Sequence, residues 1–64
     1  MNGIEYYRKK AGLTQIQLAD KVGVSQANVS IWEKGRIFPQ ADKLPILAKT
    51  LNCKIDDLFN EKEK

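Results

Sequence analysis

The sequence contains no histidine and only one cysteine, Cys53, in 64 residues. A zinc site draws on histidine and cysteine ligands and a disulfide needs two cysteines, so neither is expected, and no metal or cofactor is expected either. Without histidine, acid–base chemistry would depend on scattered carboxylates, and no glycine-rich phosphate loop is present, so the sequence does not indicate an enzyme. Cys53 lies between Leu51 and Ile55, which favours a small core residue over a reactive thiol.

Long apolar runs are also absent. The sequence therefore offers neither a membrane span nor a signal peptide, and we expect a cytoplasmic protein. The length allows a single domain, residues 1–64, with a small core that needs good packing or oligomerisation to be stable. Because the chain begins with Met1 and ends in a charged segment, we expect a complete gene product whose last residues, 62–64, are frayed.

The net charge of +3 is unevenly distributed. Residues 1–36 contain six Lys/Arg and three Asp/Glu, whereas residues 37–64 contain five of each. An excess of positive charge in one half of a small domain suits a polyanionic partner such as nucleic acid.

The region 14–35 contains two short helical patterns separated by a tight turn. Thr14 and Gln17 have the spacing of a capping box, which predicts a helix over about residues 14–21. Gly23 can adopt the positive φ that ends a helix, and Ser25 is a suitable N-cap for a second helix over about residues 26–34. Gly35 ends that helix, and the pair forms a helix-turn-helix.

The second of these helices has two unlike faces. Val29 and Trp32 define an apolar side, and the other side contains Ala27, Ser30, Ile31 and Lys34. The mixed face suits a helix whose N-terminal end enters a DNA major groove, although for a lone helix a solvated surface would be the simpler interpretation. The paired helix and the short turn favour DNA. Trp32 lies opposite this face, which favours a core position over a stacking platform for a base.

At this point the sequence resembles a known family. The segment TQIQLADKVGVSQANVSIWEKG resembles the helix-turn-helix of the Cro/C1-type, or XRE-type, repressors of phages and bacteria. The resemblance covers about residues 3–60, and it rests on Thr14, Gln15, Leu18, Ala19, Gly23, Val24, Ser25, Ser30, Trp32, Glu33, Gly35 and Pro39, with Arg8, Leu47, Ala48, Leu51, Asp56 and Leu58 outside the motif. It implies an all-α, compact five-helix, lambda-repressor-like DNA-binding domain, bacterial or phage-encoded.

The resemblance also implies roles for individual residues. Gln26, Ala27 and Ile31 occupy base-reading positions, with Ser30 close by. Gln26 can pair with adenine through two hydrogen bonds, while the apolar Ala27 and Ile31 suit thymine methyl groups. Related repressors often have polar residues at the last two positions, so this chain has few hydrogen-bonding readers. The residues expected at DNA phosphates are Thr14, Gln15, Asn28, Lys34, Arg36 and Gln40.

Further roles implied by the resemblance are structural. Gln15 braces the side chain at position 26, and Arg8 forms an ion pair with Glu33. The end of the domain often forms the dimer contact, which would place Ile55, Leu58 and Phe59 there. For Lys9 and Lys10, near the end of the first helix, DNA contact and simple solvation both remain open.

The flanking segments predict three more helices. Asn2 is a candidate cap for a first helix that Gly12 ends. Asp42 is the expected N-cap of a helix that starts near Lys43, because Pro45 then falls in the first turn, where its missing N–H breaks no bond. That helix ends at Asn52. A last helix is expected over about residues 55–61, with Lys54 in place of the usual Ser or Thr cap and two aspartates in the first turn.

Two function hypotheses follow. The first is a sequence-specific regulator of transcription that binds double-stranded DNA, a repressor acting as a homodimer on a pseudo-palindromic operator. The second is a protein-binding module, such as the antitoxin of a toxin–antitoxin pair, which would use the apolar residues Ile31, Ile37, Phe38 and Phe59. Ile37 and Phe38 are unusual in a loop, and at least one of them is expected to anchor it to the core.

Overall fold

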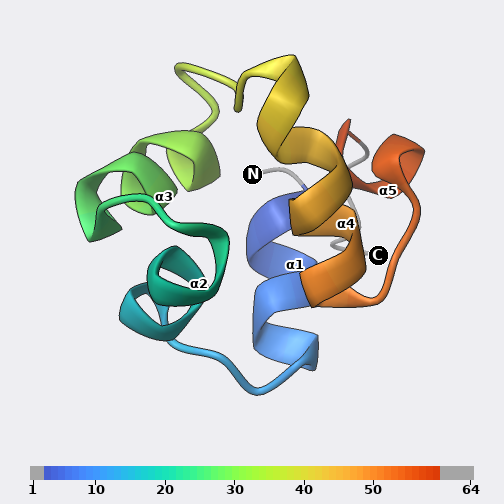
Figure 1. Ribbon diagram of the computed structural model, residues 1–64, viewed down its shortest axis with the longest axis horizontal. Helices are drawn as coiled ribbons and strands as arrows, with labels where there is room; N and C mark the ends of the chain where they lie inside the picture. Colours follow the sequence, from blue (N-terminus) through green and yellow to red (C-terminus); the bar gives the residue numbers. More distant parts are fainter. Residues whose placement is uncertain (1–2, 60–64) are drawn as a thin grey trace.

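The computed structural model describes residues 3–59, in which five α-helices and one turn of 3-10 helix are joined by short turns and no strand occurs. Figure 1 shows α2 and α3 side by side at one side of the molecule, with α1 and α4 next to them and α5 at the opposite side. The all-α, five-helix fold expected from the sequence is confirmed. The elements are α1 (Gly3–Lys10), α2 (Gln15–Val22), α3 (Gln26–Lys34), η1 (Ala41–Lys43), α4 (Leu44–Leu51) and α5 (Ile55–Phe59).

One apolar core joins all five α-helices. Each helix contributes its apolar face, as its sequence pattern predicts, and short helices of this kind depend on such packing for their stability. The buried apolar side chains are Ile4, Leu18, Ala19, Val22, Val29, Trp32, Leu47, Ala48, Leu51 and Leu58.

The first and last helices of the described chain, α1 and α5, pack against each other. A Cβ atom added to Gly3 would lie 1.9 Å from the carbonyl oxygen of Asp57, so only glycine allows this close approach of the two backbones. Ile4 and Leu58, next to these two residues, are both fully buried. The absence of a side chain at position 3 therefore sets the distance between the first and last helices.

The helix boundaries differ from the predicted ones at two places. The second helix begins one residue after Thr14, its N-cap, and extends through Val22. The prediction that Asp42 caps the fourth helix is wrong, because Asp42 lies inside η1 and Lys43 is the residue that precedes α4. Pro45 nevertheless lies in the first turn of α4, as expected, and Asn52 ends that helix with a φ of 56°.

The start of α5 is capped by a side chain from within the helix. Asp57 Oδ2 accepts a hydrogen bond of 3.1 Å from the backbone N–H of Lys54, the residue that stands where Ser or Thr is usual. The expected cap at Asn2, the end of the last helix near Glu61 and the frayed tail at 62–64 lie outside the described residues.

Candidate nucleic-acid interface

Local hydrogen bonds hold α2 and α3 in a fixed relation. Both bonds of the predicted capping box are present, because Thr14 Oγ1 accepts from the Gln17 N–H at 3.0 Å and Gln17 Oε1 accepts from the Thr14 N–H at 2.9 Å. Gly23 has a φ of 85°, and its N–H bonds to the Ala19 carbonyl at 2.8 Å. Ser25 Oγ then accepts from the Asn28 N–H, and α3 begins. The turn between the two helices is therefore specified by local chemistry.

The two faces of α3 are separated as the sequence predicts. Val29 and Trp32 are buried in the core. Gln26 and Ala27, at the N-terminal end of the helix, are exposed, and Ser30 and Ile31 are half-buried. The four expected base-reading residues thus lie outside the core, with the most accessible pair at the end of the helix that a major groove admits most readily.

Beneath this helix lies a buried ion pair between α1 and α3. Arg8 Nε donates to Glu33 Oε2, and Arg8 Nη2 donates to Glu33 Oε1 at 3.2 Å. Arg8 Nη1 also donates to the carbonyl oxygen of Leu13 at 2.7 Å, in the turn before α2. The expected pairing is present, and it ties α1, α3 and the intervening turn together.

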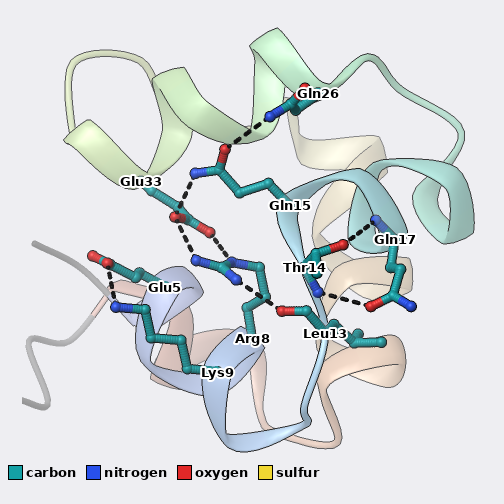
Figure 2. A network of polar contacts seen from close by, with 9 residues as sticks. All are labelled: Glu5, Arg8, Lys9, Leu13, Thr14, Gln15, Gln17, Gln26 and Glu33. Carbon is teal, nitrogen blue, oxygen red and sulfur yellow. Dashed lines mark hydrogen bonds and ion pairs between the residues drawn. The ribbon is translucent and has the colours of Figure 1, made fainter.

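Gln15 extends this network to the reading end of α3. Figure 2 shows its amide between Glu33 and Gln26. Gln15 Nε2 donates to Glu33 Oε1 at 2.9 Å, and Gln26 Nε2 donates to Gln15 Oε1 at 3.4 Å. The expected brace from Gln15 to Gln26 is present. Its attachment to Glu33 is a contact that the sequence did not predict, since it joins residues 18 positions apart.

A groove beside α3 brings together two of the expected phosphate contacts. Asn28 and Gln40 both line it, together with Lys43, which was not identified from the sequence as a candidate. Its apolar walls include Ile37 and Phe38 from the loop that follows α3. Amide and ammonium groups above an apolar wall suit a sugar–phosphate backbone, because phosphate oxygens accept hydrogen bonds and deoxyribose is largely apolar.

The remaining expected phosphate contacts are accessible. Lys34 and Arg36 are exposed at the end of α3 and just beyond it. Thr14 and Gln15 lie at the N-terminus of α2. The first backbone N–H groups of a helix have no carbonyl partner within that helix. Such a helix end attracts anions.

The three residues expected at a dimer contact differ in their exposure to solvent. Leu58 is 0% exposed and belongs to the core, so its side chain offers no accessible surface to a partner in this structure. Ile55 and Phe59 are 39% and 53% exposed. The Phe59 ring stacks on Phe38, with 4.4 Å between centroids and 17° between planes, so Phe38 joins the loop to α5. Phe38 is not among the side chains packed against the buried core, so this contact differs from the expected anchor to the core.

Other chemistry is sparse in the part of the chain that the structure describes. No group of three or more Asp, Glu, Cys or His side chains is placed to hold a metal there. Partial burial raises the pKa of the Cys53 thiol, and the nearby Asp57 carboxylate raises it further, as befits a residue that packs against the core. Among residues 3–59, no helix has the length and apolar character needed to cross a membrane.

Comparison with known proteins agrees with this geometry. A helix-turn-helix family model matches residues 4–58. A helix-turn-helix-type transcriptional regulator of Methanocaldococcus jannaschii is 40% identical over 58 residues, which cover 91% of this chain and 88% of that protein. Repressor protein C2 of Salmonella phage P22 is 39% identical over 52 residues, 81% of this chain but 24% of that protein.

The fold is shared with a solved structure. The N-terminal DNA-binding domain of SinR, the master biofilm regulator of Bacillus subtilis, matches with a TM-score of 0.77 and 30% identity, over 100% of this chain and 97% of that chain. The family model, the relatives and the structural neighbour agree on a class of regulators and not of enzymes. The chain belongs to the XRE-type helix-turn-helix family of DNA-binding transcriptional regulators.

Proposed function

We propose that this protein is a repressor that binds a pseudo-palindromic operator in double-stranded DNA as a homodimer, in the cytoplasm of a bacterium or a phage-infected cell. The observation that carries the proposal is the accessible N-terminal end of α3. Gln26 and Ala27 are exposed there, while the opposite side of the same helix is buried in the core. A rigid helix that presents side chains beyond the protein surface can reach base edges in the major groove.

The phosphate contacts would flank this helix on both sides. At one side, the N-terminus of α2 offers Thr14 and the backbone N–H of Gln15. At the other, Asn28 and Gln40 share a groove, and Lys34 and Arg36 are exposed nearby. Lys43 joins this set as a contact proposed from the structure alone. Contacts to phosphates fix the register of α3 on the duplex and supply most of the affinity.

Dimerisation follows from the size of the reading surface. One short helix makes few base contacts, whereas two copies double them and match a site with two-fold symmetry. The fold extends 28 Å along its longest principal axis, so two copies side by side can place their recognition helices about one helical turn, roughly 34 Å, apart. Ile55 and Phe59 on α5, with Ile37 in the loop, provide exposed apolar surface for this contact. A bound dimer would repress by blocking access of RNA polymerase to the promoter.

The first test is selection from a pool of randomised duplexes, followed by sequencing of the retained DNA. Two inverted half-sites with centres one helical turn apart would support a dimeric regulator. A single half-site would refute the dimer and retain the DNA-binding function. Retention without any enriched sequence would refute sequence-specific regulation.

A second candidate function is that of a protein-binding module such as an antitoxin. It is favoured by the exposure of Ile37 at 60% and Phe59 at 53%, since large exposed apolar side chains mark contact surfaces. Ile31 and Phe38 contribute less to such a surface because each is half-buried. A gene for a toxin-like protein next to this one, and purification of the two proteins as a stoichiometric complex, would support this function.

A further inference from the structure

In the hydrogen-bond network of Figure 2, each glutamine donates to the next residue toward Glu33: Gln26 donates to Gln15, and Gln15 donates to Glu33. The network starts at the Glu33 carboxylate, which is buried and paired with Arg8. An ionised carboxylate has only acceptors, so a neighbouring amide must turn its NH₂ group toward it. The Gln15 amide does so, with Nε2 at 2.9 Å from Glu33 Oε1. Its orientation is therefore imposed by Glu33.

The same constraint passes to Gln26. With its nitrogen toward Glu33, Gln15 presents its carbonyl oxygen to the reading end of α3. A carbonyl oxygen only accepts, so the Gln26 amide must turn its nitrogen toward it, and the two atoms lie 3.4 Å apart. One of the two N–H groups of Gln26 is thereby engaged within the protein. Its carbonyl oxygen and the second N–H are left for DNA.

This pair of free groups distinguishes the two purines. In the major groove adenine presents one donor, at N6, and one acceptor, at N7, which match one acceptor and one donor on the protein. Guanine presents two acceptors, N7 and O6, and calls for two donors. A glutamine whose amide is free to turn can direct its NH₂ group toward guanine, whereas Gln26 has already used one N–H on Gln15.

We infer that Glu33 is a positioning residue for sequence specificity: acting through Gln15, it fixes the Gln26 amide so that this side chain selects adenine over guanine. The inference rests on the proposed function, because it supposes that Gln26 reads a base. Glu33 itself is 7% exposed and does not reach the DNA. Arg8 holds its carboxylate in place through the ion pair.

The test compares base preference at one operator position. Duplex selection with the wild-type chain yields the motif, and the same selection with Gln26→Ala identifies the position that Gln26 reads. The ratio of affinities for A and G at that position is then measured with otherwise identical duplexes. A paired amide contact predicts a wild-type ratio of about tenfold or more.

Gln15→Met is the informative variant. It breaks the connection but keeps the backbone N–H of residue 15 and the Arg8–Glu33 pair, so the A-to-G ratio is expected to fall to about threefold or less. Preferences at other positions are expected to stay unchanged, an effect that a general loss of structure would not produce. Gln40→Met is the matched control: the same chemical change at a proposed phosphate contact should weaken binding to both duplexes equally.

The double variant Arg8→Met and Glu33→Met gives a second measurement: it leaves no charge buried and removes the acceptor that orients Gln15, so the same fall in the ratio is expected. An unchanged A-to-G ratio in Gln15→Met would overturn the inference while leaving the proposed function intact. A wild-type preference for a base other than adenine at the Gln26 position would also overturn it. Failure of the wild-type chain to enrich any motif would overturn the proposed function and this role with it.

Discussion

Replacing either member of the Arg8–Glu33 pair with methionine should remove most of the stability of the domain. The side chains of Arg8 and Glu33 are 10% and 6% exposed, so each single substitution leaves a charge buried without its partner. Such a change typically destabilises a protein by about 3 to 5 kcal/mol. A domain of 64 residues has a free energy of unfolding of about 3 to 10 kcal/mol in total.

The double substitution should be less harmful than the sum of the two single ones. When both charges are replaced by apolar side chains of similar volume, no charge remains buried, and the net loss can be small. We therefore expect the effects of Arg8→Met and Glu33→Met to be non-additive by at least about 2 kcal/mol. Gln15 still loses its acceptor at Glu33, so the double variant is not expected to equal the wild type.

Urea denaturation followed by the fluorescence of the single tryptophan, Trp32, measures these free energies. Trp32 is buried and directly precedes Glu33, so its emission reports loss of the core. The control is the ion pair of the exposed Lys9 and the half-buried Glu5, at 3.0 Å in α1, where Lys9→Met should change stability by no more than about 0.5 kcal/mol. Strictly additive effects at Arg8 and Glu33, or single losses as small as that of the control, would refute the reasoning.

Four further outcomes are expected. Gly3→Ala should lower the free energy of unfolding by about 1 to 3 kcal/mol in urea titration, because its Cβ would collide with the backbone of Asp57; an unchanged midpoint would mean that the two helices can separate freely. Cys53 should react with iodoacetamide at pH 8 more slowly in the folded protein than in guanidinium, since its raised pKa leaves less thiolate; equal rates would contradict that shift. Arg36→Ala should weaken DNA binding about equally for all sequences. It should also reduce the slope of log affinity against log salt by about one, as the loss of a phosphate contact predicts. A change in base preference would instead show that Arg36 contacts a base. Ile31→Asp should abolish operator binding through repulsion from DNA while circular dichroism still shows a folded domain; retained affinity would remove α3 from the groove.

The parts of the fold that were predicted correctly are those that local chemistry decides. The capping box of Thr14 and Gln17 and the turn at Gly23 involve residues within a few positions of one another, so their signals can be read directly from the chain. The N-cap of α4 was assigned to Asp42 from the position of Pro45 alone, and this assignment was wrong. A proline in the first turn fixes where a helix can start to within a residue or two, but not whether a 3-10 turn precedes it.

The parts that were missed depend on distant residues. Nothing near Gly3 indicates that the backbone of Asp57 will lie against it. The spacing of Ile55, Leu58 and Phe59 marks all three as apolar without showing which one the core will enclose, and Leu58 is the one that it encloses. For the candidate site, the resemblance supplied the pairs Arg8–Glu33 and Gln15–Gln26. The bond that connects the two pairs, from Gln15 to Glu33, depends on how α2 and α3 are placed in space.

The stack of Phe38 on Phe59 has a thermodynamic consequence for assembly. Phe38 belongs to the loop that contains Arg36 and Gln40, whereas Phe59 belongs to the helix proposed to meet a second copy. In the proposed homodimer, a shift of this loop on DNA would change the surface that α5 presents to its partner, and pairing at α5 would restrain the loop. Linkage makes such an effect reciprocal. In the proposed homodimer, DNA binding at the loop and pairing at α5 would then change one another's affinity by the same factor.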